Sequence, residues 1–263
     1  MILCVDVGNT NLKFAVFDGD ELKCSWRAAT DLKRTSDEYG AHLMEMLSIN
    51  GLTKENITGG IFSSVVPSLD YTVEHLFSAY LNITPLEIAP GLKTGLKMRA
   101  DNAKEVGADR VVNNVAAIRT YGANKPMIVV DFGTATTFNI IDAEGAFIGG
   151  VIAPGIKGSL DSLVSGTAKL PRVEIAAPKS VIATNTVTNM QAGIVFGFAG
   201  LVESIVARIK AELKTRDVIT IATGGFSEII AKETKCIDII DKTLTLNGLK
   251  YLYYLNTEEG KYI

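Results

Sequence analysis

Two short segments of this chain place an aspartate and a glycine directly after an apolar run. The first, at the N-terminus, reads M-I-L-C-V-D-V-G-N-T-N-L-K, and the second, from Lys125, reads K-P-M-I-V-V-D-F-G-T-A-T-T. In each copy the aspartate (Asp6, Asp131) is followed by one apolar residue, then glycine (Gly8, Gly133), then small hydroxyl or amide residues. Carboxylates suit Mg²⁺ or its waters, and backbone N–H groups and hydroxyls donate to phosphate oxygens. The repeated pattern therefore favours a site for phosphate and metal.

Each copy also predicts a hairpin, because a second apolar run begins a few residues after the glycine. Asp and Gly are common turn residues, so a single copy would be weak support for a site. The alternative is an old duplication whose bends survive only as turns. An unpaired carboxylate next to a buried strand is costly, which favours a functional site at Asp6 and Asp131.

A third segment, Gly107-Ala108-Asp109-Arg110, places an acid and a base side by side before another apolar stretch. The pair could be a surface ion pair. In phosphoryl transfer, however, a carboxylate can accept the proton of the attacking hydroxyl, and arginine suits bidentate capture of a carboxylate. Asp109 and Arg110 have the chemistry for these two roles.

The composition restricts the classes of function. The chain has 263 residues, 47% of them apolar, with a net charge of −3 and no basic tract, so we expect no nucleic-acid partner. We find no run of the roughly 18 uncharged apolar residues that span a bilayer and no secretion signal at the N-terminus. Three scattered cysteines indicate neither a disulfide framework nor a zinc site, and the two histidines fit ordinary helix positions. We therefore expect a cytoplasmic protein.

The apolar periodicity predicts alternating strands and helices after an opening set of three strands in each half. Strands are predicted at Ile2–Asp6, Leu12–Phe17, Glu21–Arg27, Gly60–Val66, Met127–Asp131, Thr136–Ile141, Ala146–Ala153, Val218–Ala222 and Ile237–Ile240. Helices are predicted at Tyr39–Asn50, Ser68–Leu81, Asn102–Tyr121, Asn185–Lys214, from Phe226, and at Leu244–Leu255.

The long helix Asn185–Lys214 carries Gly193, Gly197 and Gly200, each costing about 1 kcal/mol relative to alanine in a helix interior. Their spacing allows close approach of another backbone. Two explanations remain open: tight packing on the sheet, or a subunit interface.

The element order resembles that of the actin-like ATPases, which bind nucleotide between two similar halves. We predict an α/β fold of duplicated actin-like (ribonuclease H-like) domains, each a mixed five-stranded sheet with flanking helices. The domains are expected at residues 1–122 and 123–263. Because both halves are short, a small phosphotransferase is favoured over a filament or a chaperone.

The chain also resembles the type III pantothenate kinases, a family that includes Bvg accessory factor-like proteins. The motifs that carry the resemblance are D-V-G-N-T-N from Asp6, G-A-D-R from Gly107, D-F-G-T-A-T-T from Asp131, G-G-V-I-A-P-G from Gly149, N-T from Asn185, M-Q-A-G from Met190 and A-T-G-G from Ala222.

The resemblance implies ATP-dependent phosphorylation of pantothenate with Mg²⁺ and a monovalent cation, K⁺ or ammonium, in a homodimer. It implies Asp109 as the general base, Asp131 as a ligand of the monovalent cation and Asp6 facing the Mg²⁺–phosphate group. It implies ATP binding by Asp6, Val7, Gly8, Asn9, Thr10, Asn11, Leu12, Lys13 and Thr134. It implies pantothenate binding by Gly107, Ala108, Asp109, Arg110 and, across the dimer interface, Thr186. The residues alone also allow Thr186 to belong to a helix cap.

One position departs from the family pattern. Ala100 stands where the family usually has a tyrosine that lines the pantothenate pocket, and a buried aromatic ring contributes much contact area. Two alternatives therefore stay beside pantothenate kinase: a kinase for another small hydroxy acid, and a nucleotide-binding regulatory protein. The intact G-A-D-R segment favours catalysis.

Overall fold

The computed structural model describes residues 1–102 and 105–257, which form two compact units. Unit 1 contains Met1–Leu96, the described part of Asn102–Ala116 and the segment from Leu244. Unit 2 contains Lys97–Asp101 and Ala117–Thr243. This division differs from the expected boundary after residue 122, because the C-terminal helix packs on the first sheet.

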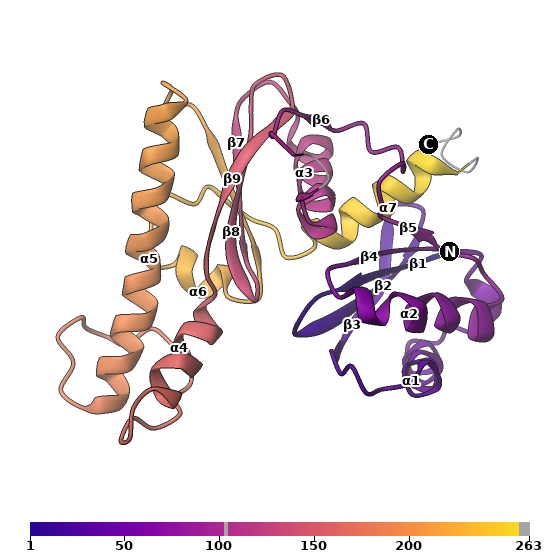
Figure 1. Cartoon of the computed structure of the whole chain (residues 1–263), viewed down its shortest axis with the longest axis horizontal. Coiled ribbons are helices and arrows are strands. Elements are labelled where there is room, and N and C mark those ends of the chain that lie inside the picture. The colour runs from indigo at the N-terminus through magenta and orange to yellow at the C-terminus, as the bar shows by residue number, and fades with distance from the viewer. Residues whose placement is uncertain (103–104, 258–263) are drawn as a thin grey trace. The chain divides into compact units, whose positions relative to one another are not determined.

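The elements follow the predicted alternation, with additions (Figure 1). The strands are β1 Ile2–Val7, β2 Asn11–Asp18, β3 Glu21–Ala29, β4 Gly59–Ser64, β5 Leu86–Glu87, β6 Lys97–Met98, β7 Met127–Phe132, β8 Ala135–Ile141, β9 Ala146–Pro154, β10 Ile219–Gly224 and β11 Ile239–Ile240. The α-helices are α1 Ser36–Ile49, α2 Asp70–Leu76, α3 Ala108–Tyr121, α4 Ile156–Ser165, α5 Thr186–Glu212, α6 Ser227–Ala231 and α7 Leu244–Asn256. Short 3₁₀ turns lie at Lys54–Asn56 and Pro67–Leu69, and a π-helical turn lies at Phe77–Leu81.

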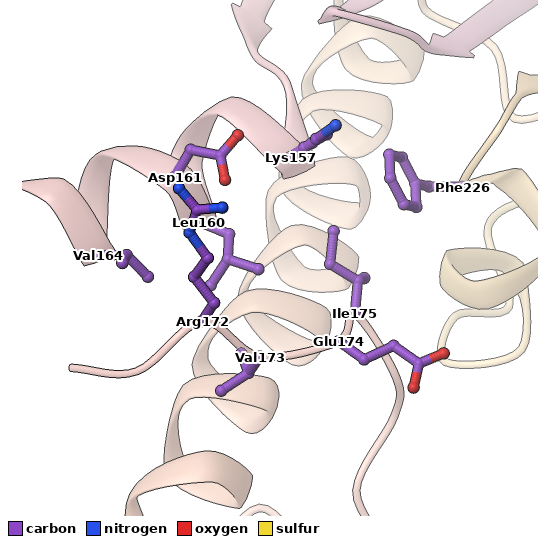
Figure 2. Close-up of a pocket in the computed structure, with 9 residues that line it drawn as sticks. All are labelled: Lys157, Leu160, Asp161, Val164, Arg172, Val173, Glu174, Ile175 and Phe226. Carbon is purple, nitrogen blue, oxygen red and sulfur yellow. The ribbon is translucent and has the colours of Figure 1, made fainter.

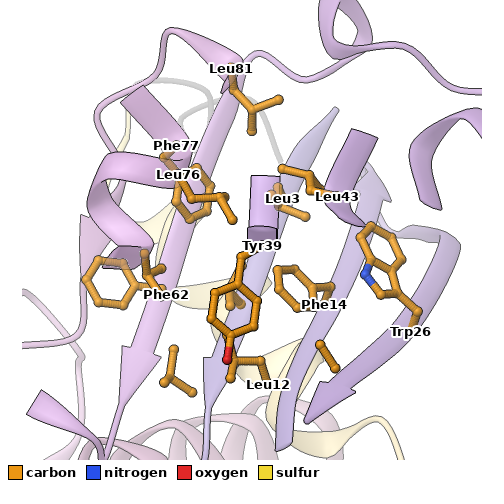
Figure 3. Packing of buried hydrophobic residues seen from close by; sticks show 14 of the residues in the cluster. Leu3, Leu12, Phe14, Trp26, Tyr39, Leu43, Phe62, Leu76, Phe77 and Leu81 are labelled. Carbon is orange, nitrogen blue, oxygen red and sulfur yellow. The ribbon is translucent and has the colours of Figure 1, made fainter. Parts of the chain in front are cut away.

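Unit 1 is built on a sheet with strand order β3-β2-β1-β4-β5. The β1–β2 and β2–β3 pairs are antiparallel, whereas β4 and β5 are parallel to β1. One face packs against α1 and α2 through a core that includes Phe14, Tyr39 and Phe62 (Figure 3). The other face packs against α7 and the first turns of α3 through residues such as Cys4 and Leu249. The sheet therefore has helices on both faces.

Unit 2 repeats this arrangement. Its sheet has the order β11-β10-β7-β8-β9-β6, in which β9-β8-β7-β10-β11 corresponds strand by strand to β3-β2-β1-β4-β5. Helices α4, α5 and α6 supply the apolar residues that pack on its core. The duplicated mixed-sheet fold is confirmed. The second sheet has six strands instead of five, because β6 pairs with the edge of β9.

Some predicted boundaries are wrong. The helix predicted at Ser68–Leu81 is divided into a 3₁₀ turn, α2 and a π-helical turn. The helix predicted from Asn102 begins at Ala108, while 103–104 lie outside the described residues. Helix α4 was not predicted, because Pro154-Gly155 was interpreted as a turn between other elements.

Helix α5 buries one side in unit 2 and exposes its glycines. A Cβ added at Gly193, Gly197 or Gly200 would have no neighbour within 4 Å apart from the helix's own backbone. Among the described residues, these glycines therefore do not pack on the sheet of unit 2, and the subunit-interface explanation stays a prediction.

The same helix is long and apolar enough, by length and composition, to cross a membrane, and among the described residues it alone passes this test. Its best 18-residue window has a mean hydropathy of 1.7. Core helices of soluble proteins pass the same test, and Val195, Val202 and Val206 are buried against the sheet of unit 2. Packing in this core accounts for the buried part of that window, which is 44% of it.

Candidate active site

A row of three polar side chains crosses the sheet of unit 1 at the end of β1. Asp6 lies opposite Lys13 on β2 and opposite Ser63 on β4. Lys13 Nζ donates to Asp6 Oδ2 at 3.0 Å, and Ser63 Oγ donates to Asp6 Oδ1 at 3.0 Å. Asp6 is 6% exposed and Ser63 is fully buried, so these bonds stabilise a carboxylate that is largely removed from water. These hydrogen bonds hold the charged side chains of Asp6 and Lys13 in one orientation next to the turn of the first hairpin.

The turn between β1 and β2 contains the residues predicted to bind phosphate. The N–H of Gly8 donates to the carbonyl of Asn11 at 3.1 Å and closes the turn, leaving Asn9 and Thr10 exposed at its tip. The side chains of Val7 and Leu12 are instead buried in the apolar core of unit 1. These two residues can therefore reach a ligand only through their backbone.

Asp109 lies in the first turn of α3, on the sheet face that carries Asp6. Side chains at alternate positions of a strand point to the same face of the sheet. Asp6 is two residues after Cys4, which packs against α3 and α7, so Asp6 lies on the face that these helices cover. Burial, and then the charge of Asp6, raise the pKa of the Asp109 carboxyl. The backbone N–H and charge of Arg110 and the charge of Lys13 oppose this shift. A raised pKa is what a carboxylate needs to act as a proton acceptor near neutral pH.

The residues beside Asp109 hold its side chain. The backbone N–H of Arg110 donates to Asp109 Oδ1 at 2.8 Å. A Cβ at Gly107 would lie 2.6 Å from the same oxygen, so a larger residue there would displace the Asp109 carboxylate from this position. Burial lowers the pKa of the Arg110 guanidinium, and the charge of Asp109 acts against that shift. The G-A-D-R segment, with half-buried Ala108 at the start of α3, is thus shaped around Asp109.

The second hairpin, in unit 2, also bends at an Asp-x-Gly segment, but its turn is one residue shorter than the first. The N–H of Gly133 donates to the carbonyl of Ala135 at 3.0 Å, so Gly133 and Thr134 form a tight bend between β7 and β8. Asp131 is half-buried and pairs with Thr223 on β10. A Cβ at Gly224 would lie 2.5 Å from Asp131 Oδ1, and Gly224 has a φ of +91°. Glycine is therefore required at position 224, because of the positive φ and because a Cβ would also lie 2.6 Å from the backbone carbonyl oxygen of Phe132.

Gly155 packs directly against the backbone of the second hairpin. A Cβ built on it would collide with the carbonyl group of Thr134 and would lie 2.9 Å from the carbonyl oxygen of Gly133. Both groups are backbone, which cannot move aside as a side chain can. Gly155 is also the N-cap of α4, so the helix begins directly against the turn.

A cavity of about 430 Å³ lies beside this hairpin within unit 2 (Figure 2). Its lining comes from α4, from the segment 172–175 and from Phe226, which directly follows Gly224 and Gly225. Leu160, Val173 and Ile175 make its walls apolar, and the charged lining residues are balanced in sign: Lys157, Arg172, Asp161 and Glu174. Apolar walls with charged groups of both signs can contact an organic molecule.

Unit 2 contains Thr186, which is expected to bind pantothenate, and Ala100, the departure from the family pattern, whereas the G-A-D-R segment belongs to unit 1. Thr186 is exposed at the first position of α5, and the cap itself is Asn185, whose side chain accepts from the N–H of Thr188. Ala100 is half-buried just after β6. Arg99 connects this segment to the rest of unit 2. Its backbone N–H donates to the carbonyl of Phe147, and its guanidinium Nη1 lies 2.6 Å from Asp142 Oδ2.

The described part of the chain gathers few potential metal-binding side chains at any one place. Among residues 1–102 and 105–257, no group of three or more His, Cys, Asp and Glu side chains is arranged to hold a metal. Mg²⁺ bound with ATP needs only one or two carboxylates, because phosphates and waters complete its shell. Asp6 fits this requirement, and Asp131 can supply an oxygen ligand to a second ion.

Sequence reasoning missed three residues that shape the site: Ser63, Thr30 and Gly155. Ser63 belongs to β4, whose register against β1 only the fold reveals. Thr30 contacts the first turn from the end of β3. Gly155 ends the G-G-V-I-A-P-G motif, and its Pro-Gly dipeptide is the feature of the sequence that could have indicated a close backbone contact.

Comparisons with known proteins give matches over nearly the whole chain. A family model for type III pantothenate kinase matches residues 2–208. The type III pantothenate kinase of Geobacillus kaustophilus (strain HTA426) is 50% identical over 259 residues, which cover 98% of this chain and 99% of the relative. That of Geobacillus thermodenitrificans (strain NG80-2) is 49% identical with the same coverage.

Solved structures extend the likeness in fold at low identity. A Campylobacter jejuni protein described as Baf family matches with a TM-score of 0.60 and 17% identity, covering 99% of this chain and 100% of that one. An inorganic polyphosphate/ATP-glucomannokinase from Arthrobacter sp. strain KM matches with a TM-score of 0.52 and 14% identity, covering 97% and 99%. These two structures show a shared fold, whereas the family model and the Geobacillus relatives show kinship: the chain belongs to the type III pantothenate kinase family.

Proposed function

We propose that this protein transfers the γ-phosphoryl group of ATP to the hydroxyl of pantothenate, forming 4'-phosphopantothenate and ADP on the route to coenzyme A. Family membership supports the reaction. The observation that carries the mechanism is the Asp109 carboxylate, oriented by Arg110 N–H and held on the sheet face beside Asp6.

In this mechanism Asp109 accepts the proton of the pantothenate hydroxyl as its oxygen attacks the γ-phosphorus. The bond between that phosphorus and the bridging oxygen of ADP breaks, and ADP leaves. The raised pKa of Asp109 brings its proton affinity closer to the working pH, which improves a general base. Enzymes of this type depend mainly on positioning and charge neutralisation, and a base adds to both.

The phosphates of ATP are assigned to the two turns. In unit 1 the segment Asp6–Lys13 would bind them through backbone N–H groups and the ammonium of Lys13, with Asp6 toward Mg²⁺. In unit 2 Thr134 would donate to a phosphate, and Asp131 would hold K⁺ or ammonium. The nucleoside would occupy the cavity beside Phe226. The Asp-x-Gly bend present in both hairpins and the lining of the cavity by Phe226, which follows Gly224-Gly225, support these assignments.

Pantothenate is assigned to the G-A-D-R segment, where Arg110 would bind its carboxylate and Gly107 and Ala108 would contact it. Thr186 would reach the substrate from the second chain of a homodimer, and the exposed glycine face of α5 supports such an assembly. A reaction between ATP and a small acid fits a cytoplasmic enzyme without nucleic-acid or membrane partners.

A coupled ADP-release assay with and without pantothenate, in Mg²⁺ and K⁺, tests this proposal. Pantothenate-dependent ADP release, with a phosphorylated product by mass spectrometry, is the expected result. Release only with a different hydroxy acid would favour the second candidate, which Ala100 supports because a small side chain stands at a position expected to line the pocket. Nucleotide binding without turnover on any such acid would favour a regulatory protein.

A further inference from the structure

Thr30, the residue after β3, contacts the first hairpin through two hydrogen bonds. Its hydroxyl donates to the carbonyl of Gly8 at 2.6 Å, and its backbone N–H donates to the carbonyl of Thr10 at 3.0 Å. Thr30 is half-buried. One residue outside the turn therefore holds two of the turn's carbonyl groups.

The two bonds fix the direction of the neighbouring N–H groups. None of the peptide bonds in the described part of the chain is cis, and in a trans peptide the C=O and N–H groups point in opposite directions. When the carbonyls of Gly8 and Thr10 point toward Thr30, the N–H groups of Asn9 and Asn11 point away from it. N–H groups gathered on one side of a turn form a concavity that binds anions.

We propose that Thr30 is a positioning residue for the phosphates of ATP: its hydroxyl holds the Gly8–Asn11 turn with its N–H donors directed toward the phosphates. This inference rests on the proposed function. The two bonds have separable effects. The backbone bond continues the β2–β3 ladder and persists in any variant except proline, whereas the hydroxyl bond acts on the turn alone.

Three variants isolate the hydroxyl. Thr30→Val keeps the shape and β-branching of the side chain but removes the donor, and Thr30→Ser keeps the donor. Thr58→Val is the matched control, because the Thr58 hydroxyl also donates to a backbone carbonyl, that of Met1, at 3.2 Å. Met1 precedes β1 and so lies at the opposite end of that strand from the turn.

We expect Thr30→Val to raise the KM for ATP, and the Kd for MgADP measured by calorimetry, by roughly three- to tenfold, the loss of one neutral hydrogen bond. The KM for pantothenate should stay unchanged. Thr30→Ser and Thr58→Val should stay within about twofold of the unmodified protein. If Thr30→Val lowers the unfolding temperature, Thr30→Ser and Thr30→Ala, which differ by the hydroxyl, give the same contrast.

Several results would overturn the inference. Unchanged nucleotide affinity in Thr30→Val would do so while leaving the proposed function intact, as would equal losses for ATP and pantothenate. An unmodified protein that phosphorylates no acid but binds MgADP would contradict the proposed function alone, and the calorimetric comparison would still decide the role of Thr30. A protein that binds no nucleotide would overturn both.

Discussion

Replacing Asp109 with asparagine separates its catalytic role from its effect on the fold. The amide oxygen of the new side chain can still accept from the N–H of Arg110, which lies 2.8 Å from Asp109 Oδ1, so the side chain keeps its orientation. The second carboxylate oxygen is replaced by an NH₂ group, a donor where the mechanism needs an acceptor. We expect kcat to fall by about 10²–10⁴-fold, or roughly 3–5 kcal/mol of activation free energy, with little change in ATP affinity.

The same variant should be more stable at neutral pH. Burial and the charge of Asp6 raise the pKa of Asp109 in the folded state, so the charged form destabilises the fold. Below the ordinary aspartate pKa the carboxyl is protonated in both states and has no such effect. The destabilisation develops as the pH rises from that value through the folded pKa. Asparagine avoids it, so Asp109→Asn should raise the unfolding temperature at pH 7 and lose this advantage as the pH falls through the folded pKa.

Coupled ADP release measures the first effect, and calorimetric or fluorescence melts from pH 3 to pH 8 measure the second. Asp18→Asn is a suitable control, since Asp18 is an exposed carboxylate at the end of β2 remote from the turn. Turnover equal to that of the unmodified protein in Asp109→Asn would refute its role as the base. A melting difference that is the same at every pH, or has the opposite sign, would refute the electrostatic argument.

Three further predictions concern unit 2 and the assembly. Gly155→Ala should displace the second hairpin and lower kcat/KM for ATP, with a loss of roughly 1–3 kcal/mol in stability from overpacking. Gly158→Ala, in the open interior of α4, is the control and should be neutral or slightly stabilising. Equal behaviour of the two variants in melts and assays would contradict the contact between Gly155 and the hairpin. Exchanging Na⁺ for K⁺ or ammonium should raise the rate, and Asp131→Ala should abolish that response; identical rates in all three salts would exclude the cation assignment. The protein should be a dimer by light scattering, and mixing Asp109→Asn chains with Thr186→Trp chains should restore some activity, whereas a monomer would rule out a shared site.

The parts of the site that follow from local pattern could be predicted from the sequence. Asp6 and Gly8 follow a β-branched apolar run, and such a run, a glycine and a second run specify a hairpin without reference to the rest of the chain. The same reasoning predicts the bend at Asp131. The duplicated sheet order follows because both halves present the same series of elements.

The contacts made between distant segments could not be predicted in this way. Ser63 meets Asp6 only because β4 pairs with β1 in one register, which depends on the packing of the intervening helices. Gly155 meets the second hairpin because α4 begins there. Helix α4 itself carried a detectable pattern, with Ile156, Leu160 and Val164 at intervals of four, but the preceding Pro-Gly pair obscured it.

The position of α7 has a consequence for how the chain folds during synthesis. This helix, the last that the structure describes, covers the face of the first sheet that carries Cys4 and Phe17 (Figure 1). The ribosome makes that face early, and α3, which covers part of it, follows, but α7 emerges only after the whole of unit 2 has been translated. Until then the part of this apolar surface that α7 covers has no native partner, and exposed apolar surfaces promote aggregation. Unit 2 is almost continuous in sequence and can complete its core first. The sheet of unit 1, although it is translated first, completes its packing only when α7 has been made.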